Sequence, residues 1–247
     1  SSLPVSGFQT AISRVKKAGL DVCDFQVLLD AAHENHDHDM EYLYGHEAEH
    51  SHGHADGPAR ENAHPQHGRT HGGYAHEHRG LPEILRIIEQ ADLTARAKET
   101  AVRIFCILAA AEAKAHGVPE EQVHFHEVGA VDSIVDIVGA AICYHSIAPD
   151  AVYASAVNVG SGFVKCAHGL LPVPAPATAE ILAGTKLPVY AKAAEGECAT
   201  PTGAAILAEL ASHRDRLPAM NIETVGYGFG EKEFEVLNAL RMFVGEC

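Results

Sequence analysis

Residues 94–116, TARAKETAVRIFCILAAAEAKAH, predict an amphipathic helix with one buried apolar stripe. Apolar side chains return to one face at three- and four-residue intervals, as the 3.6-residue period requires. Gly117 follows where such a helix would end. The predicted buried stripe consists of Ala97, Ala101, Ile104, Phe105, Leu108, Ala111 and Ala115.

Helical and extended patterns alternate on both sides of this segment, which predicts the α/β class, a mixed fold of helices and strands. Apolar spacing predicts helices over 8–20, 81–90, 132–145, from about 175 to 184, and 199–211. Pro82 suits the first turn of the second of these helices. Strands are predicted at 21–31, 151–160, 186–191 and from 222 to the end, where a glycine turn separates the last two.

Composition restricts the class of partner. The 247 residues carry a formal net charge of −15, which disfavours a nucleic-acid partner. No run reaches the roughly 18 apolar residues of a membrane helix, and no signal-peptide pattern is present. The six cysteines lack any C-x-x-C pair, so we expect buried, reduced thiols and a cytoplasmic location. The oligomeric state stays open, a homo-oligomer included.

Residues 33–78 differ from the rest of the chain, because they hold 12 of the 18 histidines with nine acidic residues and two arginines. Without a sustained apolar period, this tract is expected to be a disordered insertion. Imidazole suits nickel, copper and zinc, and H-x-H pairs on extended backbone place both rings on one face. The candidate metal ligands in the tract are His36, His38, His52, His54, His76 and His78.

Residues 123–136, VHFHEVGAVDSIVD, place ionisable side chains within an apolar run. Asp132 is expected to cap a helix in which Ile134, Val135, Val138, Ala141 and Ile142 are buried, with Asp136 one turn further on the same face. A bend at Gly129 would let the side chains converge to hold a metal or move protons. Helix capping with histidines packed in a loop is the alternative. The candidate catalytic residues are His124, His126, Glu127, Asp132 and Asp136, with the two histidines also candidate metal ligands.

Further segments could bind an anionic ligand. A helix beginning near Thr200 offers unpaired N–H groups and the positive end of its dipole. Neither the P-loop nor the dinucleotide pattern is present, each segment alone is a weak signal, and ordinary turn or cap formation is the alternative explanation. The candidate ligand-binding residues are Ser161, Gly162, His168, Thr200, Thr202 and Gly203.

The order of four motifs resembles the nickel insertion protein family of the nickel-pincer cofactor pathway, the LarC family. The motifs are HFHEVGAVDSIVDIVG, HGLLPVPAPAT, ATPTGAAIL, and GYGFG followed by LNALR. The histidine-rich insertion before the first motif is also similar to that family. The resemblance covers roughly residues 8–246.

The resemblance implies insertion of nickel into pyridinium-3,5-bisthiocarboxylic acid mononucleotide, which gives the pincer cofactor of lactate racemase-type enzymes. The complete protein would be a lyase or chelatase-type enzyme that consumes CTP with Mn or Mg. The tract would then deliver nickel, residues 124–136 would hand it over or remove a ring proton, and Thr200 and Thr202 would contact the substrate phosphate.

The resemblance also implies a division of the chain. Residues 1–32 would begin the α/β domain without its native first strand, 33–80 would form the histidine-rich loop, and 81–247 would complete the nickel-handling domain. The CTP-binding domain would be absent and could be a separate polypeptide. A nickel store or metallochaperone and a metal-dependent hydrolase are the alternative functions.

Overall fold

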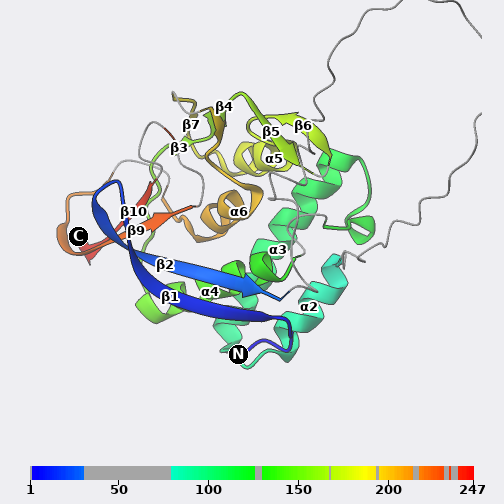
Figure 1. The fold of residues 1–247 in the computed structure, drawn as a ribbon, viewed down its shortest axis with the longest axis horizontal. Helices are drawn as coiled ribbons and strands as arrows, with labels where there is room; N and C mark the ends of the chain where they lie inside the picture. Colours follow the sequence, from blue (N-terminus) through cyan, green and yellow to red (C-terminus); the bar gives the residue numbers. More distant parts are fainter. Residues whose placement is uncertain are drawn as a thin grey trace, which may run out of the picture.

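The structure is a computed structural model, and it confirms a mixture of helices and strands (Figure 1). The described residues are 2–30, 79–125, 130–166, 168–192, 195–213, 217–230, 234 and 239–247. The histidine-rich tract at 33–78 and its six candidate ligands therefore lie outside the described residues.

Helix α3, Ala95–His116, lies at the centre of the fold and contacts α2, α4, α5 and α6. The Thr94 hydroxyl accepts a hydrogen bond from the Ala97 N–H at 3.3 Å and caps its start. Gly117 ends it in the left-handed conformation at φ 67°, which glycine adopts without steric cost. The predicted stripe is confirmed except at its end, where Ala115 is exposed and Ala113 is buried instead.

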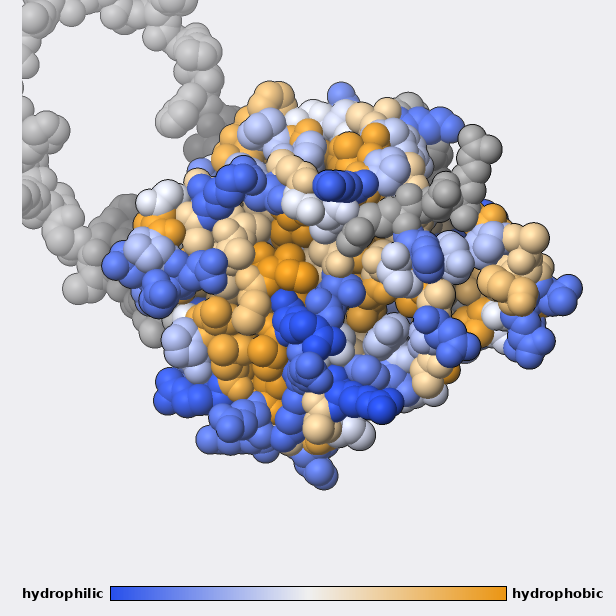
Figure 2. Space-filling model, turned by 180° about the vertical axis from the view of Figure 1, so that it is seen from behind, coloured by the Kyte–Doolittle hydropathy of each residue, from blue (hydrophilic) through white to orange (hydrophobic). Residues whose placement is uncertain are grey.

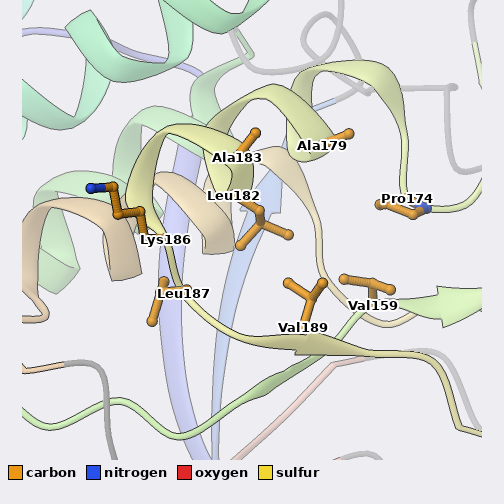
Figure 3. A pocket seen from close by; sticks show the side chains of 8 residues that line it. All are labelled: Val159, Pro174, Ala179, Leu182, Ala183, Lys186, Leu187 and Val189. Carbon is orange, nitrogen blue, oxygen red and sulfur yellow. The ribbon is translucent and has the colours of Figure 1, made fainter.

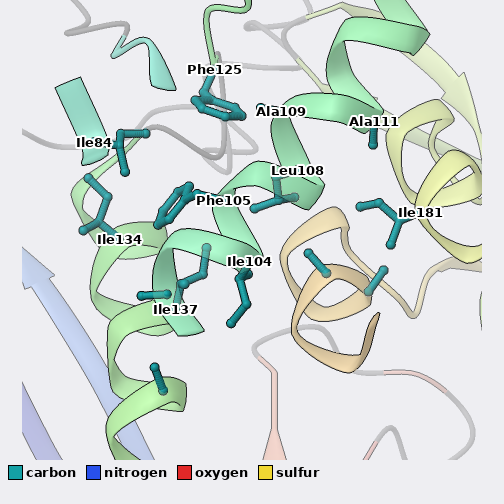
Figure 4. Packing of buried hydrophobic residues seen from close by; sticks show 14 of the residues in the cluster. Ile84, Ile104, Phe105, Leu108, Ala109, Ala111, Phe125, Ile134, Ile137 and Ile181 are labelled. Atoms are coloured by element: carbon teal, nitrogen blue, oxygen red, sulfur yellow. The ribbon is translucent and has the colours of Figure 1, made fainter. Parts of the chain in front are cut away.

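The core forms where α3 packs against its neighbours (Figure 4). Its large side chains without solvent access include Ile84, Ile88, Ile104, Phe105, Leu108, Ile134 and Ile137. Full burial of each such side chain contributes about 1.5–3 kcal/mol. The core is therefore mainly a helical one.

The other helices agree with the predicted ranges to within a few residues. They are α2 Leu81–Gln90, α4 Val131–Ile147, α5 Pro176–Thr185 and α6 Pro201–Leu210. The short 3₁₀ helix η2, Glu120–Gln122, precedes α4 and was not predicted. In α4 the predicted burial is wrong at Ile142, which is 37% exposed, while Val131 and Ile137 are buried.

The helix predicted over residues 8–20 is wrong. Strand β1, Phe8–Lys17, pairs in antiparallel register with β2, Leu20–Leu29, through the two-residue turn Ala18–Gly19. Both turn residues have positive φ, 48° and 81°, as a type I′ hairpin turn requires. The predicted strand at 21–31 is confirmed by β2.

Short strands precede and follow α5 in the chain, while longer ones form the C-terminal hairpin. The short strands are β3 Val157–Asn158, β4 Gly160–Ser161, β5 Phe163–Cys166, β6 Gly169–Pro172, β7 Val189–Tyr190 and β8 Gly196–Glu197. The hairpin joins β9 Asn221–Phe229 to β10 Ala239–Glu246. Among the described residues, every named strand belongs to a two-stranded pair.

The two long hairpins lie side by side, because β2 contacts β9 and the Lys17 ammonium donates to the Gly230 carbonyl at 2.8 Å (Figure 1). They leave large apolar side chains accessible, with Ile12 75% and Leu240 62% exposed. On the face seen from behind, apolar and hydrophilic residues alternate in patches (Figure 2).

The cysteines are free, as predicted, but their predicted burial is wrong. Cys23, Cys106, Cys143 and Cys247 are exposed, whereas Cys166 and Cys198 are partly accessible. Partial desolvation and the nearby Glu120 carboxylate raise the pKa of the Cys106 thiol. Within the part of the chain that the structure describes, no helix combines the length and apolarity that a membrane crossing needs.

Candidate functional site

The segment that leads into the 123–136 motif is held in extended form against the chain just before α2. His124 forms an antiparallel bridge with Gly80, and the Phe125 N–H donates to the Arg79 carbonyl at 3.3 Å. Val123 and Phe125 are buried at 3% and 2% exposure, while His124 between them is exposed. Alternation along extended backbone thus turns the His124 imidazole away from the core.

Phe125 fixes this segment to the central helix, since its ring meets that of Phe105 edge-on with centroids 6.2 Å apart (Figure 4). Such aromatic pairs contribute about 0.5–1.5 kcal/mol beyond burial. The next residues, 126–129, lie outside the described part of the chain, so the convergence of His126 and Glu127 with His124 stays a prediction.

The predicted N-cap role of Asp132 is wrong. Ala130 occupies the N-cap of α4, and Asp132 is the second residue of the helix. Its Oδ1 accepts a hydrogen bond from the adjacent Ser133 N–H at 2.8 Å. The helix begins earlier than expected because Val131 is buried at 3% exposure, which brings the first turn into the core. The carboxylate still lies in the first turn, where the helix dipole stabilises negative charge.

Asp136 follows one turn later, and the pKa of its carboxyl group is raised. Desolvation, and secondarily the negative charge of Asp132, raises its pKa from 3.8 to about 6. Asp136 retains solvent access, yet the protein around its carboxyl removes enough water to disfavour the charged form. A carboxyl group with this pKa can accept and release a proton near neutral pH.

Among the described residues, the ionisable side chains around the motif do not form a complete metal centre by themselves. Within the described ranges, no three His, Cys, Asp or Glu side chains are grouped so that they could hold one ion. Metal binding at His124 would therefore need donors from the undescribed residues 126–129 or from a substrate.

Ser161 and Gly162 lie at the end of β4, where two backbones approach closely. Gly160 pairs with β8, and a Cβ on Gly160 would lie 2.0 Å from the Gly196 carbonyl oxygen. Ser161 forms backbone bridges to Gly196 and Glu195. The close approach of the two backbones leaves no room for a side chain at Gly160.

The start of α6 has fewer unpaired donors than the sequence suggests. The Thr200 hydroxyl accepts from the Gly203 N–H at 3.2 Å, and Pro201 has no N–H. The remaining first-turn donor is the N–H of Thr202, which has no partner within the helix. An anion at this position would compete with the Thr200 cap for the Gly203 donor.

His168 lies near the turn between β5 and β6, and the structure places it beside a histidine that the sequence analysis missed. The rings of His168 and His116 have centroids 4.9 Å apart and planes tilted by 45°. His116 Nε2 lies 3.4 Å from Oε2 of Glu112, one turn earlier on α3. The Glu112–His116 spacing of four residues at a helix end was the signal available in the sequence.

A pocket of about 390 Å³ lies between α5 and the short strands (Figure 3). Sequence periodicity did not indicate it, because its wall combines α5 and the residues around it with Val159, which lies just before β4. Lys186 supplies a cationic side chain in an otherwise apolar lining. The lining residues are Val159, Pro174, Ala179, Leu182, Ala183, Lys186, Leu187 and Val189.

Comparison with known proteins gives a consistent result. A model of the family described as nickel insertion protein matches residues 1–247. A "pyridinium-3,5-bisthiocarboxylic acid mononucleotide nickel insertion protein" of Alkaliphilus metalliredigens is 40% identical over 247 residues, which are 99% of this chain and 52% of the relative. No solved structure matches.

Relatives that align over a shorter part of the chain have a higher sequence identity. A protein of the same name from Desulfitobacterium hafniense is 53% identical over 171 residues, 69% of this chain and 42% of the relative. A "putative nickel insertion protein" of Geobacter metallireducens is 55% identical, over 69% of this chain and 43% of its own length. The chain thus spans about half the length of the curated relatives it matches.

Proposed function

The chain belongs to the nickel insertion protein family, and from this premise we propose that it is the nickel-handling portion of an enzyme that inserts nickel into pyridinium-3,5-bisthiocarboxylic acid mononucleotide. The family match over residues 1–247 is the observation that carries the proposal. The names of the relatives favour nickel insertion over a nickel store or a metal-dependent hydrolase.

Nickel is the substrate of this reaction and has to form a bond to a pyridinium ring carbon between two thiocarboxylates. The ring carbon loses its proton when the carbon–nickel bond forms. The protein must therefore carry the ion, orient the sulfur atoms and accept the proton. The third task requires a base whose pKa lies near the working pH.

Asp136 suits the role of proton acceptor. With a pKa of about 6 it is mostly ionised at pH 7, yet it is a stronger base than an ordinary carboxylate. Asp132, one turn earlier, contributes negative charge that raises this pKa. We assign the base role to Asp136 and an electrostatic role to Asp132, and we keep Glu127 as a further carboxylate of the same motif.

His124 suits the role of nickel donor at the point of transfer. Its imidazole is exposed while both neighbours anchor the segment in the core, so the ring is accessible on a fixed backbone. Together with His126 it would form an H-x-H pair, which supplies two imidazoles and leaves coordination positions for the thiocarboxylates. The histidines of residues 33–78 would supply the ion.

The substrate would lie along Ser161, Gly162, His168 and the start of α6. Thr202, rather than Thr200, is the better candidate for a phosphate contact, because Thr200 already caps the helix. We place CTP, with Mn or Mg, on the part of the relatives that this chain does not cover. The lyase assignment, the cytoplasmic location and a separately made CTP-binding partner belong to this proposal.

A single-turnover assay of nickel transfer in the complete protein tests these roles. His124→Ala should slow transfer about tenfold or more, as loss of a metal-ligand contact does. Asp136→Asn should slow it about 100-fold or more, which is the usual contribution of a general base. His213→Ala is the matched control, since His213 stacks on Tyr153 with centroids 4.5 Å apart.

Unchanged transfer in both motif variants would refute the assigned roles. The insertion function itself would be refuted if the complete protein, loaded with nickel and CTP, left the mononucleotide free of nickel. Retained nickel binding in that case would favour the metal-store alternative.

A further inference from the structure

We propose that His116 and His168 form a second nickel-binding site, a two-imidazole pair at the end of α3 through which the ion passes between protein and substrate. The placement of the two rings supports the site itself. The identification of its ion as nickel rests on the proposed function.

The separation of the two rings suits coordination of one ion. At metal–nitrogen distances of about 2.1 Å, imidazoles in neighbouring positions have centroids about 4.5–5.5 Å apart. The centroids of His116 and His168 are 4.9 Å apart. The 45° tilt between the planes differs from parallel stacking, whereas the His213 and Tyr153 rings stack at 13°.

Glu112 orients one member of the pair. Its Oε2 lies 3.4 Å from His116 Nε2, and the Glu112 side chain is only 18% exposed. A carboxylate beside one ring nitrogen fixes the tautomer and makes the other nitrogen a stronger donor. Coordination would therefore use His116 Nδ1, the ring nitrogen that faces away from this contact.

The end of α3 attracts a cation. His116 is the last residue of a 22-residue helix, and Gly117 caps it. The partial negative charge at a helix C-terminus stabilises cations by about 0.3–1 kcal/mol. The nearby Lys114 is paired with Glu180, so its positive charge is offset.

The pair also has the properties that a transfer site needs. His116 and His168 are both exposed, so an ion can reach them from solvent. They come from separate parts of the chain, the end of α3 and the β5–β6 turn, so their separation depends on the tertiary fold. Two protein donors bind more weakly than a closed four-ligand site and leave positions for thiocarboxylate sulfur.

Residue-level protection from diethylpyrocarbonate, read by peptide mass spectrometry, tests the pair in the full chain. Nickel chloride, buffered at defined free concentrations, should slow modification of His116 and His168 over the same concentration range. His145 and His213 serve as internal references. His145 Nε2 lies 2.9 Å from the Thr100 hydroxyl and has no second imidazole among its described partners.

Substitutions test the coupling. In His116→Ala, His168 should lose its protection, whereas His213→Ala should leave it unchanged. Glu112→Gln should raise the nickel concentration for half-protection about tenfold, as loss of a ligand-orienting carboxylate does. His116→Gln, which keeps a polar side chain at the helix end, controls for local unfolding.

Protection of His168 that persists in both His116 variants would overturn the pair, as would no protection of either residue at millimolar nickel. These readouts need no mononucleotide. Coupled protection without nickel transfer would uphold this site and count against the proposed insertion function. Nickel transfer without coupled protection would uphold the insertion function and count against this site.

Discussion

Asp136 lies one helical turn after Asp132 on α4, and the negative charge of Asp132 adds to the desolvation that raises the pKa of Asp136 to about 6. Removal of that charge in Asp132→Asn should lower the pKa of Asp136. The value should stay above its ordinary range, because desolvation is the larger cause. Carboxyl ¹³C titration by NMR measures this, with Asp92→Asn as a control outside α4. No change in Asp132→Asn would show that the two carboxyl groups do not interact.

The same pKa predicts a pH-dependent stability difference. Because the folded chain favours protonated Asp136, its contribution to stability is fully present below about pH 3.8 and is lost as pH rises through about 6. Asp136→Asn stays neutral, so it should stabilise the fold at pH 7 and have little effect at pH 4.

The full shift corresponds to about 3 kcal/mol, but solvent screening at this exposed residue reduces the expected gain to about 1 kcal/mol. Urea unfolding at both pH values measures the gain. A gain that is larger at pH 4 than at pH 7 would contradict the raised pKa.

Gly160 and Gly162 form a matched pair for testing the β4–β8 approach. Both have positive φ, 84° and 80°, so alanine strains the backbone at either position. At Gly160 the new Cβ would also lie 2.0 Å from the Gly196 carbonyl oxygen, whereas at Gly162 no atom of a described residue beyond its chain neighbours would lie within 4 Å of it.

Gly162→Ala should therefore cost about 1–2 kcal/mol, and Gly160→Ala about 4 kcal/mol or more. Chemical denaturation monitored by circular dichroism gives both values. Equal costs would mean that the two strands do not approach as closely as the structure shows.

At the start of α6, Thr200 has a structural role as the helix cap, whereas Thr202 has the proposed binding role. Thr200→Ala removes the acceptor of the Gly203 N–H and should destabilise the fold by about 1 kcal/mol. Thr202→Ala should cost less than about 0.5 kcal/mol, because its side chain does not cap the helix. In the complete protein, Thr202→Ala should instead weaken mononucleotide binding. The reverse order in the unfolding midpoints would contradict the capping assignment.

Sequence periodicity predicted the helical core well, because packing around α3 follows a regular period. Thr94 and Gly117 bound α3 as expected, and Ile104, Phe105 and Leu108 have no solvent access. The errors in predicted burial include Ala115, near the end of α3, and Ile142, within α4. Ala115 and Ile142 continue the apolar period beyond the region where neighbouring elements cover it, and only the tertiary structure shows where that cover stops.

The candidate site was predicted as a set of residues but not as a geometry. The extended 123–125 segment and the acidic pair on α4 follow from local patterns. The His116–His168 contact joins positions 52 residues apart, and the wall of the pocket at Lys186 joins Val159 to residues 174–189. Local spacing contains no information on such approaches, so sequence analysis could nominate His168 but not its partner.

The N-terminal hairpin shows how a helical period can mislead. Phe8, Ile12 and Val15 are spaced like one face of a helix, yet Ile12 is 75% exposed, so that spacing does not mark a buried face. The deciding feature is the turn, where Ala18 and Gly19 both adopt positive φ between paired strands. β-branched residues in β1 fit the same conformation.

Substitution of Ala18 distinguishes the hairpin from a helix by the sign of the effect. In the hairpin, the positive φ of Ala18 costs about 1–2 kcal/mol in backbone strain. Glycine removes most of this strain and adds a smaller cost in backbone conformational entropy. Ala18→Gly should therefore stabilise the fold by about 0.5–1 kcal/mol. In a helix the same change would destabilise by about 1 kcal/mol.

Ala11→Gly, in the middle of β1, is the matched control and should destabilise by about 0.5–1 kcal/mol, because glycine loses more freedom within a strand. Thermal and urea unfolding of the three proteins give the order of stability. If Ala18→Gly were less stable than the parent chain, as Ala11→Gly is expected to be, the left-handed turn at residues 18–19 would be wrong. A stability above the parent, with Ala11→Gly below it, is the outcome that only a turn at this position explains.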